Sequence, residues 1–304
     1  LGFAYDINGD SKWKAYGSWG VFYDIFKLEL PRGSFGADRW ISYYWTLDDY
    51  NWPAISCDGT PGSGCPGRFI EQVDFRHVSN EPGQVLVEPN LKPYRAQELT
   101  FGLDHELTNT MSVGVRYAHK WLDRTIEDAG IQVPGVGEVF YIVNVGEGIG
   151  TNILGSQYPA QPKPVRDYDG LEFRVRKRLA NRWSLNSSLL FSRLYGNYSG
   201  LASSDENGRT SPNVNRIFDG LHMSFDESGQ PTYGRLQTDR PVVFELQGTY
   251  ELSWGTGIST NFFAGSGTPM QDQATIQGVP VLYNGRENLG RTPALVRTDL
   301  GLWH

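Results

Sequence analysis

The sequence predicts an all-β protein: an antiparallel up-and-down transmembrane β-barrel, incomplete at about nine to eleven strands and bearing long extracellular loops. Three observations predict it: the composition, a period-two alternation of apolar and polar residues, and the order of short and long connections. Of 304 residues, 36 are Gly and 13% are aromatic, whereas 20% are charged. So many aromatic residues argue against disorder, and this composition argues against a helical bundle or coiled coil.

Four segments alternate between apolar and polar residues, as expected of strands with one apolar and one polar face. They are 111–121, 171–176, 183–192 and 294–302. In the second of them Leu171, Phe173 and Val175 point to one side, and the residues between them are charged. Less regular strands are predicted at 1–6, 11–24, 95–107, 240–251 and 257–265. The chain thus offers about nine clear strands, with about one or two more expected inside long loops.

The connections alternate in length along the chain. Short turns are predicted at 7–10, 108–110, 180–182 and 252–256, where Asn and Gly favour tight hairpins. Long connections run over roughly 25–94, 124–165, 197–239 and 266–291. Loops of this length are uncommon in compact soluble domains but normal at one end of an outer-membrane barrel. Because a soluble sandwich also alternates apolar and polar faces, the connections favour the barrel more strongly than the alternation does.

The two faces of the predicted strands have different expected surroundings, since a barrel meets lipid outside and water inside. The lumen-facing residues are expected to be Arg116, Glu172, Arg174, Arg176, Arg297 and Asp299. Aromatic residues near strand ends are expected in membrane-interface girdles, and these are Trp13, Tyr117, Trp121, Trp183 and Phe191. Lys177 falls on the apolar face beside a short turn, where its side chain is expected to snorkel to the interface.

The two cysteines, Cys57 and Cys65, are separated by Gly, Pro, Ser, Thr and Asp residues. Such a segment forms tight turns, so a small disulfide-closed loop in an oxidising compartment is expected. A metal site is not expected, because two Cys without a nearby His do not complete a tetrahedral ligand set.

A stretch rich in aromatic residues precedes the cysteines and is the best candidate for ligand contact. Its six rings are Trp40, Tyr43, Tyr44, Trp45, Tyr50 and Trp52. Aromatic faces with polar edges suit the capture of a glycan or a peptide. The alternative is that the rings pack the loop against its neighbours or extend a strand above the membrane.

No catalytic, metal or cofactor site is expected. His105-Glu106 lacks the second His of a zinc-protease helix, and no Gly-x-Ser-x-Gly elbow occurs. Gly146-Glu147-Gly148-Ile149-Gly150 lacks the Gly-Lys-Ser/Thr ending of a phosphate loop and is expected in a flexible external loop. The net charge of −7 comes without a basic stripe, so no nucleic-acid partner is expected.

Several motifs together resemble the barrel of Oar-like TonB-dependent receptors, over essentially the whole chain. The first are Leu1–Asp6 with Asn8-Gly9-Asp10, then Lys14–Asp24, Leu91–Glu98 and Val115-Arg116-Tyr117. The most specific are Tyr168–Phe173, Arg176-Lys177-Arg178, Trp183 and Arg193–Leu201, followed by Pro212-Asn213 and Phe218-Asp219. Each motif alone is weak, and their order and spacing carry the resemblance.

The resemblance implies an outer-membrane transporter of a Gram-negative-type bacterium, with a barrel of about 22 strands around an N-terminal plug. Members often carry a carboxypeptidase-regulatory-like domain as well. Residues 1–304 are then expected to be part of the barrel, with the plug and the terminal strands outside this chain. The implied partners are outer-membrane lipid, an unknown solute and, through an N-terminal region, the TonB energy-coupling complex.

Two alternatives of other classes remain open. One is a small outer-membrane barrel enzyme of the protease or lipase type, which would need a catalytic His with acid or Ser partners at the outer rim. The other is a secreted β-sandwich that binds carbohydrate with the aromatic stretch.

Overall fold

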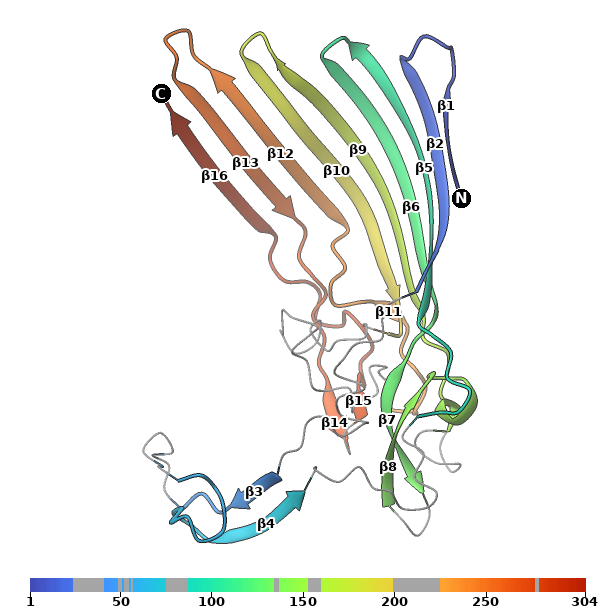
Figure 1. Ribbon diagram of the computed structural model, residues 1–304, viewed down its shortest axis with the longest axis vertical. Coiled ribbons are helices and arrows are strands. Elements are labelled where there is room, and N and C mark those ends of the chain that lie inside the picture. The colour runs from blue at the N-terminus through green and yellow to red at the C-terminus, as the bar shows by residue number, and fades with distance from the viewer. Residues whose placement is uncertain are drawn as a thin grey trace.

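The computed structural model describes residues 1–23, 41–48, 51, 55, 57–74, 87–133, 137–152, 160–198, 225–276 and 279–304. Nine of its strands pair in the order β1-β2-β5-β6-β9-β10-β12-β13-β16, and a tenth, β11, pairs with β10 (Figure 1). All these pairings are antiparallel. Each long strand therefore lies beside the preceding long strand, as the up-and-down prediction requires, and no Greek-key crossing interrupts the order of this sheet.

The strand bounds agree closely with the alternation. They are β1 Gly2–Asp6, β2 Trp13–Phe22, β5 Arg95–Thr108, β6 Met111–Arg124, β9 Arg166–Ala180, β10 Trp183–Gly196, β11 Gly234–Arg235, β12 Val242–Glu251, β13 Gly257–Gly265 and β16 Leu295–Trp303. The largest difference is β9, which extends well beyond the predicted 171–176. Its backbone pairing continues past the point where the apolar side chains stop alternating.

The four short connections of the sheet lie at one end and the long ones at the other (Figure 1). Between β9 and β10, Asn181 and Arg182 both have positive φ, 54° and 70°. This is the backbone of a two-residue hairpin turn whose twist matches the strands it joins. Between β1 and β2, the Asp6 carboxylate accepts backbone hydrogen bonds from Gly9 and Ser11, which closes the turn.

The long connections contain more strand than the sequence predicts. Among the described residues, three two-stranded antiparallel sheets occur there, against the one or two extra strands expected. Their bounds are β3 Ile41–Trp45 with β4 Phe69–Asp74, β7 Glu127–Val133 with β8 Gly137–Val143, and β14 Ala274–Ile276 with β15 Val279–Val281. A short 3-10 turn, η2, covers Gly148–Thr151. Within the described residues no helix has the length and apolar character to cross a membrane.

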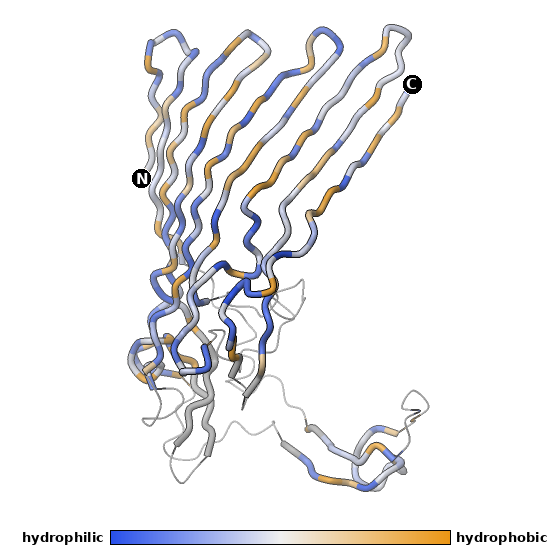
Figure 2. The backbone as a smooth tube through the Cα atoms, turned by 180° about the vertical axis from the view of Figure 1, so that it is seen from behind, coloured by the Kyte–Doolittle hydropathy of each residue, from blue (hydrophilic) through white to orange (hydrophobic). Residues whose placement is uncertain are grey.

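The strand register separates an apolar face from a polar face. One row across the sheet reads Leu103, Val115, Phe173, Leu189, Phe244, Ala264 and Val296. The next row, on the opposite face, reads Asp104, Gly114, Arg174, Ser188, Glu245, Phe263 and Arg297. Figure 2 shows the resulting alternation of apolar and polar residues along the strands.

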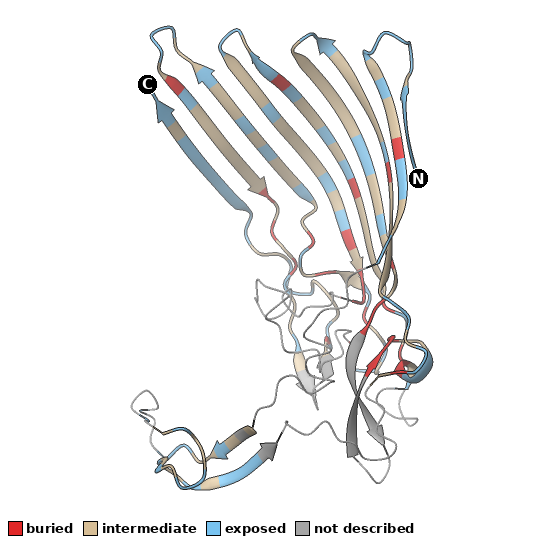
Figure 3. Ribbon diagram, in the orientation of Figure 1, coloured by how far each residue is buried: buried red, intermediate tan, exposed pale blue. Residues whose placement is uncertain are grey.

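The apolar face is uncovered by protein. Phe173 is 45% exposed and Leu300 is 77% exposed, although both lie in the middle of strands. Most of the buried apolar residues lie among the long connections (Figure 3), and Ile142, Leu236 and Leu282 are fully buried. A sheet with an exposed apolar face and no opposing layer is the arrangement of a wall that lipid covers.

Lys177 faces the apolar side, and its side chain reaches towards the adjacent short turn, the direction expected for snorkelling. Its ammonium group donates hydrogen bonds to the carbonyl oxygens of Ala180, at 2.6 Å, and Trp183, at 2.9 Å, on either side of that turn. It also lies 4.0 Å from the centre of the Trp183 ring. The residue is only 8% exposed, because the turn and this ring surround its ammonium group.

Candidate functional site

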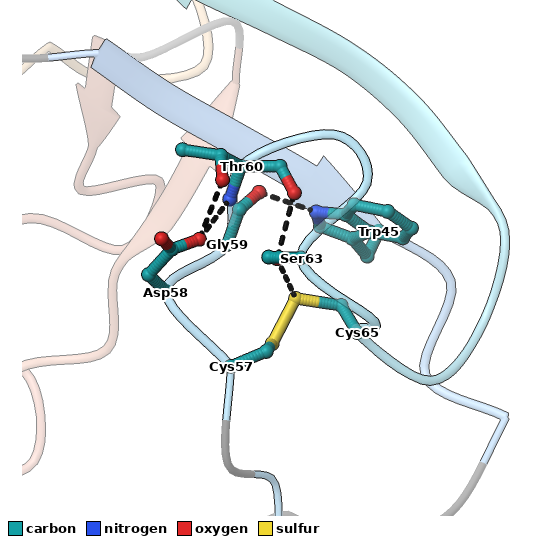
Figure 4. The surroundings of a disulfide bond; sticks show 7 residues. All are labelled: Trp45, Cys57, Asp58, Gly59, Thr60, Ser63 and Cys65. Atoms are coloured by element: carbon teal, nitrogen blue, oxygen red, sulfur yellow. Dashed lines mark hydrogen bonds between the residues drawn. A yellow bond between two sulfur atoms is a disulfide. The ribbon is translucent and has the colours of Figure 1, made fainter.

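The described part of the aromatic stretch, residues 41–48, and the cysteines form one small unit among the long connections. Cys57 and Cys65 are joined by a disulfide with a Cα–Cα distance of 5.3 Å (Figure 4). The indole Nε1 of Trp45 donates a hydrogen bond of 3.0 Å to the carbonyl of Gly59, inside the disulfide loop. The Ser63 hydroxyl lies 3.3 Å from the sulfur of Cys65. The loop is thereby held against the end of β3.

The six candidate rings do not share one environment. Tyr43 and Trp45 are half-buried, and Trp45 packs edge-on against Phe69 with ring centres 5.3 Å apart. Tyr44 points to the other side of the hairpin and is 47% exposed. Trp40, Tyr50 and Trp52 lie outside the described residues. Packing within the hairpin thus occupies two of the rings and leaves Tyr44 available to a ligand.

The turn inside the disulfide loop is fixed by Asp58. Its carboxylate accepts hydrogen bonds from the hydroxyl of Thr60, at 2.6 Å, and from the backbone N–H of the same residue, at 2.9 Å (Figure 4). These bonds favour the charged form, so they lower the pKa of Asp58 below its ordinary value.

Charged side chains on the polar face form a ladder across four strands. Arg116 and Glu172 approach to 3.0 Å. Arg174 lies 3.1 Å from a carboxylate oxygen of Asp104 and donates a hydrogen bond of 2.6 Å to the hydroxyl of Tyr16. The side chain of Arg174 is only 16% exposed, so its guanidinium is held in place by these partners.

Two glycines make room for this ladder. A Cβ at Gly102 would lie 2.1 Å from the ring of Tyr16, and a Cβ at Gly114 would lie 2.2 Å from a carboxylate oxygen of Asp104. The Tyr16 and Asp104 side chains therefore lie flat over neighbouring strands. They reach Arg174 because no side chain intervenes.

Two hollows open on the polar face. One, of about 620 Å³, is lined by Gly2, Phe3, Ala4, Lys14, Tyr16, Gly17, Ser18, Thr100, Asp104, Arg116, Arg174 and Arg176. The other, of about 450 Å³, adjoins it and includes Glu98, Lys120, Leu190 and Leu194 in its lining. Four of the six residues expected in the lumen thus gather at these hollows. Arg297 and Asp299 form a separate, exposed pair on β16, at 3.3 Å, on the same face.

A polar cluster that the sequence analysis missed lies on the apolar side, towards the long connections. The Asp169 carboxylate accepts a hydrogen bond of 2.6 Å from the Tyr117 hydroxyl and lies 2.9 Å from the Nδ1 of His119. A barrel hydrolase would need such a His–acid pair. In the part of the chain that the structure describes, no hydrogen bond links His119 to a Ser, Thr or Cys.

A second network that the sequence analysis missed ties the long connections to the wall. The side chain of Asp239 is fully buried and approaches Arg291 at 2.7 Å and Arg235 at 3.3 Å. It also accepts the backbone N–H of Leu194 at the end of β10. Among the residues described, no three potential ligand side chains are grouped to hold a metal ion.

Comparison with known proteins indicates an outer-membrane β-barrel, which is also the class that the arrangement of the strands indicates. Residues 1–267 match the family described as the outer membrane beta barrel domain. The chain is 29% identical over 191 residues to the TonB-dependent transporter Oar of Myxococcus xanthus, covering 62% of this chain and 16% of that protein. The chain thus corresponds to a minor part of that relative's length. The outer membrane transporter YddB from Escherichia coli has a TM-score of 0.51 at 9% identity, over 98% of this chain and 33% of that one, which shows the fold alone.

The antiparallel wall with one apolar and one polar face defines a piece of a transmembrane β-barrel. The chain belongs to the outer membrane beta barrel domain family. It lies in the outer membrane of a Gram-negative bacterium, and its resemblance to the barrel of Oar-like TonB-dependent receptors is confirmed. The Myxococcus xanthus relative is named as a transporter.

Proposed function

We propose that residues 1–304 form part of the barrel of a TonB-dependent transporter, which captures a solute with its outer loops and passes it along the polar face. The single observation that carries the proposal is that the long strands place apolar side chains on one face of the sheet and polar side chains on the other. An uncovered apolar face suits lipid, and an ion-paired polar face with hollows suits a water-filled path. The six charged residues predicted for the lumen would then line this path, and the barrel would perform no bond chemistry.

In this proposal the hairpin of β3 and β4 makes the first contact with solute. Tyr44 supports this role because it is exposed beside a disulfide-stapled loop that holds the hairpin in shape. The remaining partners are outer-membrane lipid, and the TonB complex acting through a region outside this chain. Relatedness to a transporter supports both, since an energy-coupled barrel needs a partner across the periplasm.

The test uses the full-length protein in cells that lack the chromosomal copy. Uptake of candidate solutes is measured for the wild type, for Tyr44→Ala and for Tyr5→Ala. The Tyr5 side chain is also exposed but lies in β1, by the short turns. We expect Tyr44→Ala to raise the solute concentration that gives half-maximal uptake about tenfold, as for the loss of one stacking ring, and Tyr5→Ala to leave that concentration unchanged. Equal effects of both variants would contradict a capture role for the hairpin.

A further inference from the structure

We infer that the larger hollow on the polar face binds an anionic group, a carboxylate or phosphate carried by the solute. This inference rests on the proposed function and adds the chemical class of the ligand. We call this hollow the basic hollow and define it by the residues that line it, given above.

The charges around the basic hollow do not balance. Four cationic side chains line it, Lys14, Arg116, Arg174 and Arg176, and Asp104 is the single carboxylate that lines it. Lys14 and Arg174 share that carboxylate, at 3.8 and 3.1 Å. Within the described residues Arg176 forms no hydrogen bond or ion pair, and it is exposed. Glu172, which does not line the hollow, lies 3.0 Å from Arg116 and 4.0 Å from Arg174. With Glu172 counted, four cations face two carboxylates, so positive charge still exceeds negative charge at this place on the polar face.

The neighbouring hollow carries a smaller excess of positive charge. Three cationic side chains line it, Arg116, Lys120 and Arg166, against the two carboxylates Glu98 and Glu172. Lys120 lies 2.9 Å from Glu98, and Arg116 lies 3.0 Å from Glu172. The basic hollow differs because four cationic side chains line it against one lining carboxylate, and because Arg176 forms no ion pair among the described residues.

The basic hollow also holds its donors in place before any ligand arrives. Arg174 is fixed by Tyr16 and Asp104, and hydroxyl groups of Ser18 and Thr100 lie in the same lining. Fixed guanidinium groups bind carboxylate and phosphate oxygens in pairs of charge-assisted hydrogen bonds. A recessed surface of one sign also concentrates its field, which raises the local concentration of ions of opposite charge. An anionic solute meets these conditions better than a neutral one.

The test measures binding of two anionic probes, inorganic pyrophosphate and tricarballylate, to the full-length protein in detergent micelles by calorimetry, with sucrose as the neutral probe. The test variant is Arg176→Gln, whose side chain has no partner in the described structure, so the fold is not expected to change. The matched control is Arg182→Gln, in the short turn between β9 and β10, where the side chain is exposed and forms no hydrogen bond or ion pair among the described residues. We expect the anions to bind the wild type, Arg176→Gln to weaken binding about tenfold, and Arg182→Gln and sucrose to show no such effect.

A second measurement tests whether the negative charge that faces the basic hollow comes from a bound ligand or from another segment of the protein. The rate of acylation of Lys14 is followed by mass spectrometry with and without pyrophosphate. We expect the probe to slow the reaction. If Lys14 is already acylated slowly without pyrophosphate, and pyrophosphate slows the reaction no further, then an acidic segment of the protein occupies the basic hollow. That result would overturn the inference. Absent probe binding, or equal binding by Arg176→Gln, would also overturn it. Normal anion binding in a protein that takes up no solute would contradict the proposed function instead.

Discussion

The guanidinium of Arg174 on β9 donates a hydrogen bond of 2.6 Å to the hydroxyl of Tyr16 on β2, although two strands lie between them. The bond spans this distance because the intervening β5 and β6 present Gly102 and Gly114 below it. The same guanidinium also reaches Asp104. These contacts join side chains of three strands, and the ion pair between Arg116 on β6 and Glu172 on β9 adds the fourth.

Replacing Gly102, which lies under the ring of Tyr16, should weaken these side-chain contacts between strands. A Cβ at Gly102 would meet the ring of Tyr16 at 2.1 Å, so Gly102→Ala forces the ring aside and breaks its bond with Arg174. We expect a loss of about 1–3 kcal/mol in the free energy of unfolding, measured by urea titration in lipid vesicles. The control is Gly248→Ala, whose Cβ would find its nearest neighbour at 3.6 Å. An equal loss in both variants would mean that the ladder contributes nothing specific.

The two faces should respond differently to a new charge. Phe173→Arg places a guanidinium in the middle of the apolar face, where lipid would surround it. We expect about 2–4 kcal/mol of destabilisation on folding into vesicles, since this is the cost of Arg near the bilayer midplane. Gln247→Arg, on the polar face of β12, should change stability by less than about 1 kcal/mol. A soluble protein would not show this contrast in a lipid-dependent way.

The disulfide should stabilise the hairpin and leave the wall unaffected. Closure of so short a loop is worth about 2–3 kcal/mol, which acts locally because no strand of the sheet passes through it. In the double variant Cys57→Ser, Cys65→Ser we expect faster amide exchange in β3 and β4 and a more solvated Trp45. Folding of the sheet should be unchanged. Reductant acting on the wild type provides the matched comparison, and slowed folding of the sheet in either case would refute local action.

An acid-sensitive clamp is predicted among the long connections. The Lys163 ammonium donates a hydrogen bond of 2.8 Å to the Glu147 carboxylate, and Lys92 does so at 3.2 Å. These bonds hold the pKa of Glu147 below its ordinary value of about 4.3. Because the folded-state pKa is the lower one, the stabilisation is complete above about pH 5 and is lost as the pH falls through the folded value.

The amide-exchange protection factors of residues 144–152, each corrected for the intrinsic exchange rate at that pH, measure this loss at pH 7 and at pH 3. In the wild type the protection factors should fall at the lower pH. In Glu147→Gln they should be low at both pH values, because the amide cannot titrate. An equal fall in the variant would assign the pH dependence to another group.

The wall was predictable because one face of every long strand must be apolar along its whole transmembrane length. The bounds of β9 were underestimated, since Asp167 and Asp169 break the alternation while the backbone pairing continues. The contacts of Tyr16 and Asp104 depend on the register between strands, which single-strand patterns do not contain. One feature of the sequence could have predicted these contacts. Gly102 and Gly114 occupy polar-face positions in adjacent strands, and Tyr16 and Asp104 each lie one strand away from one of these glycines.

The order of short turns and long connections also constrains how this wall is built and changed. Closing the segment of roughly 70 residues between β2 and β5 costs about 3 kcal/mol more chain entropy than closing the turn between β5 and β6. Each hairpin with a short turn therefore forms ahead of its pairing with the next one. A gain or loss of one strand would move every later turn to the opposite side of the membrane, whereas a whole hairpin preserves the side of all of them. The two-strand hairpin is therefore the smallest unit by which the number of strands in such a sheet can change during evolution, because only an even change keeps every turn on its own side of the membrane.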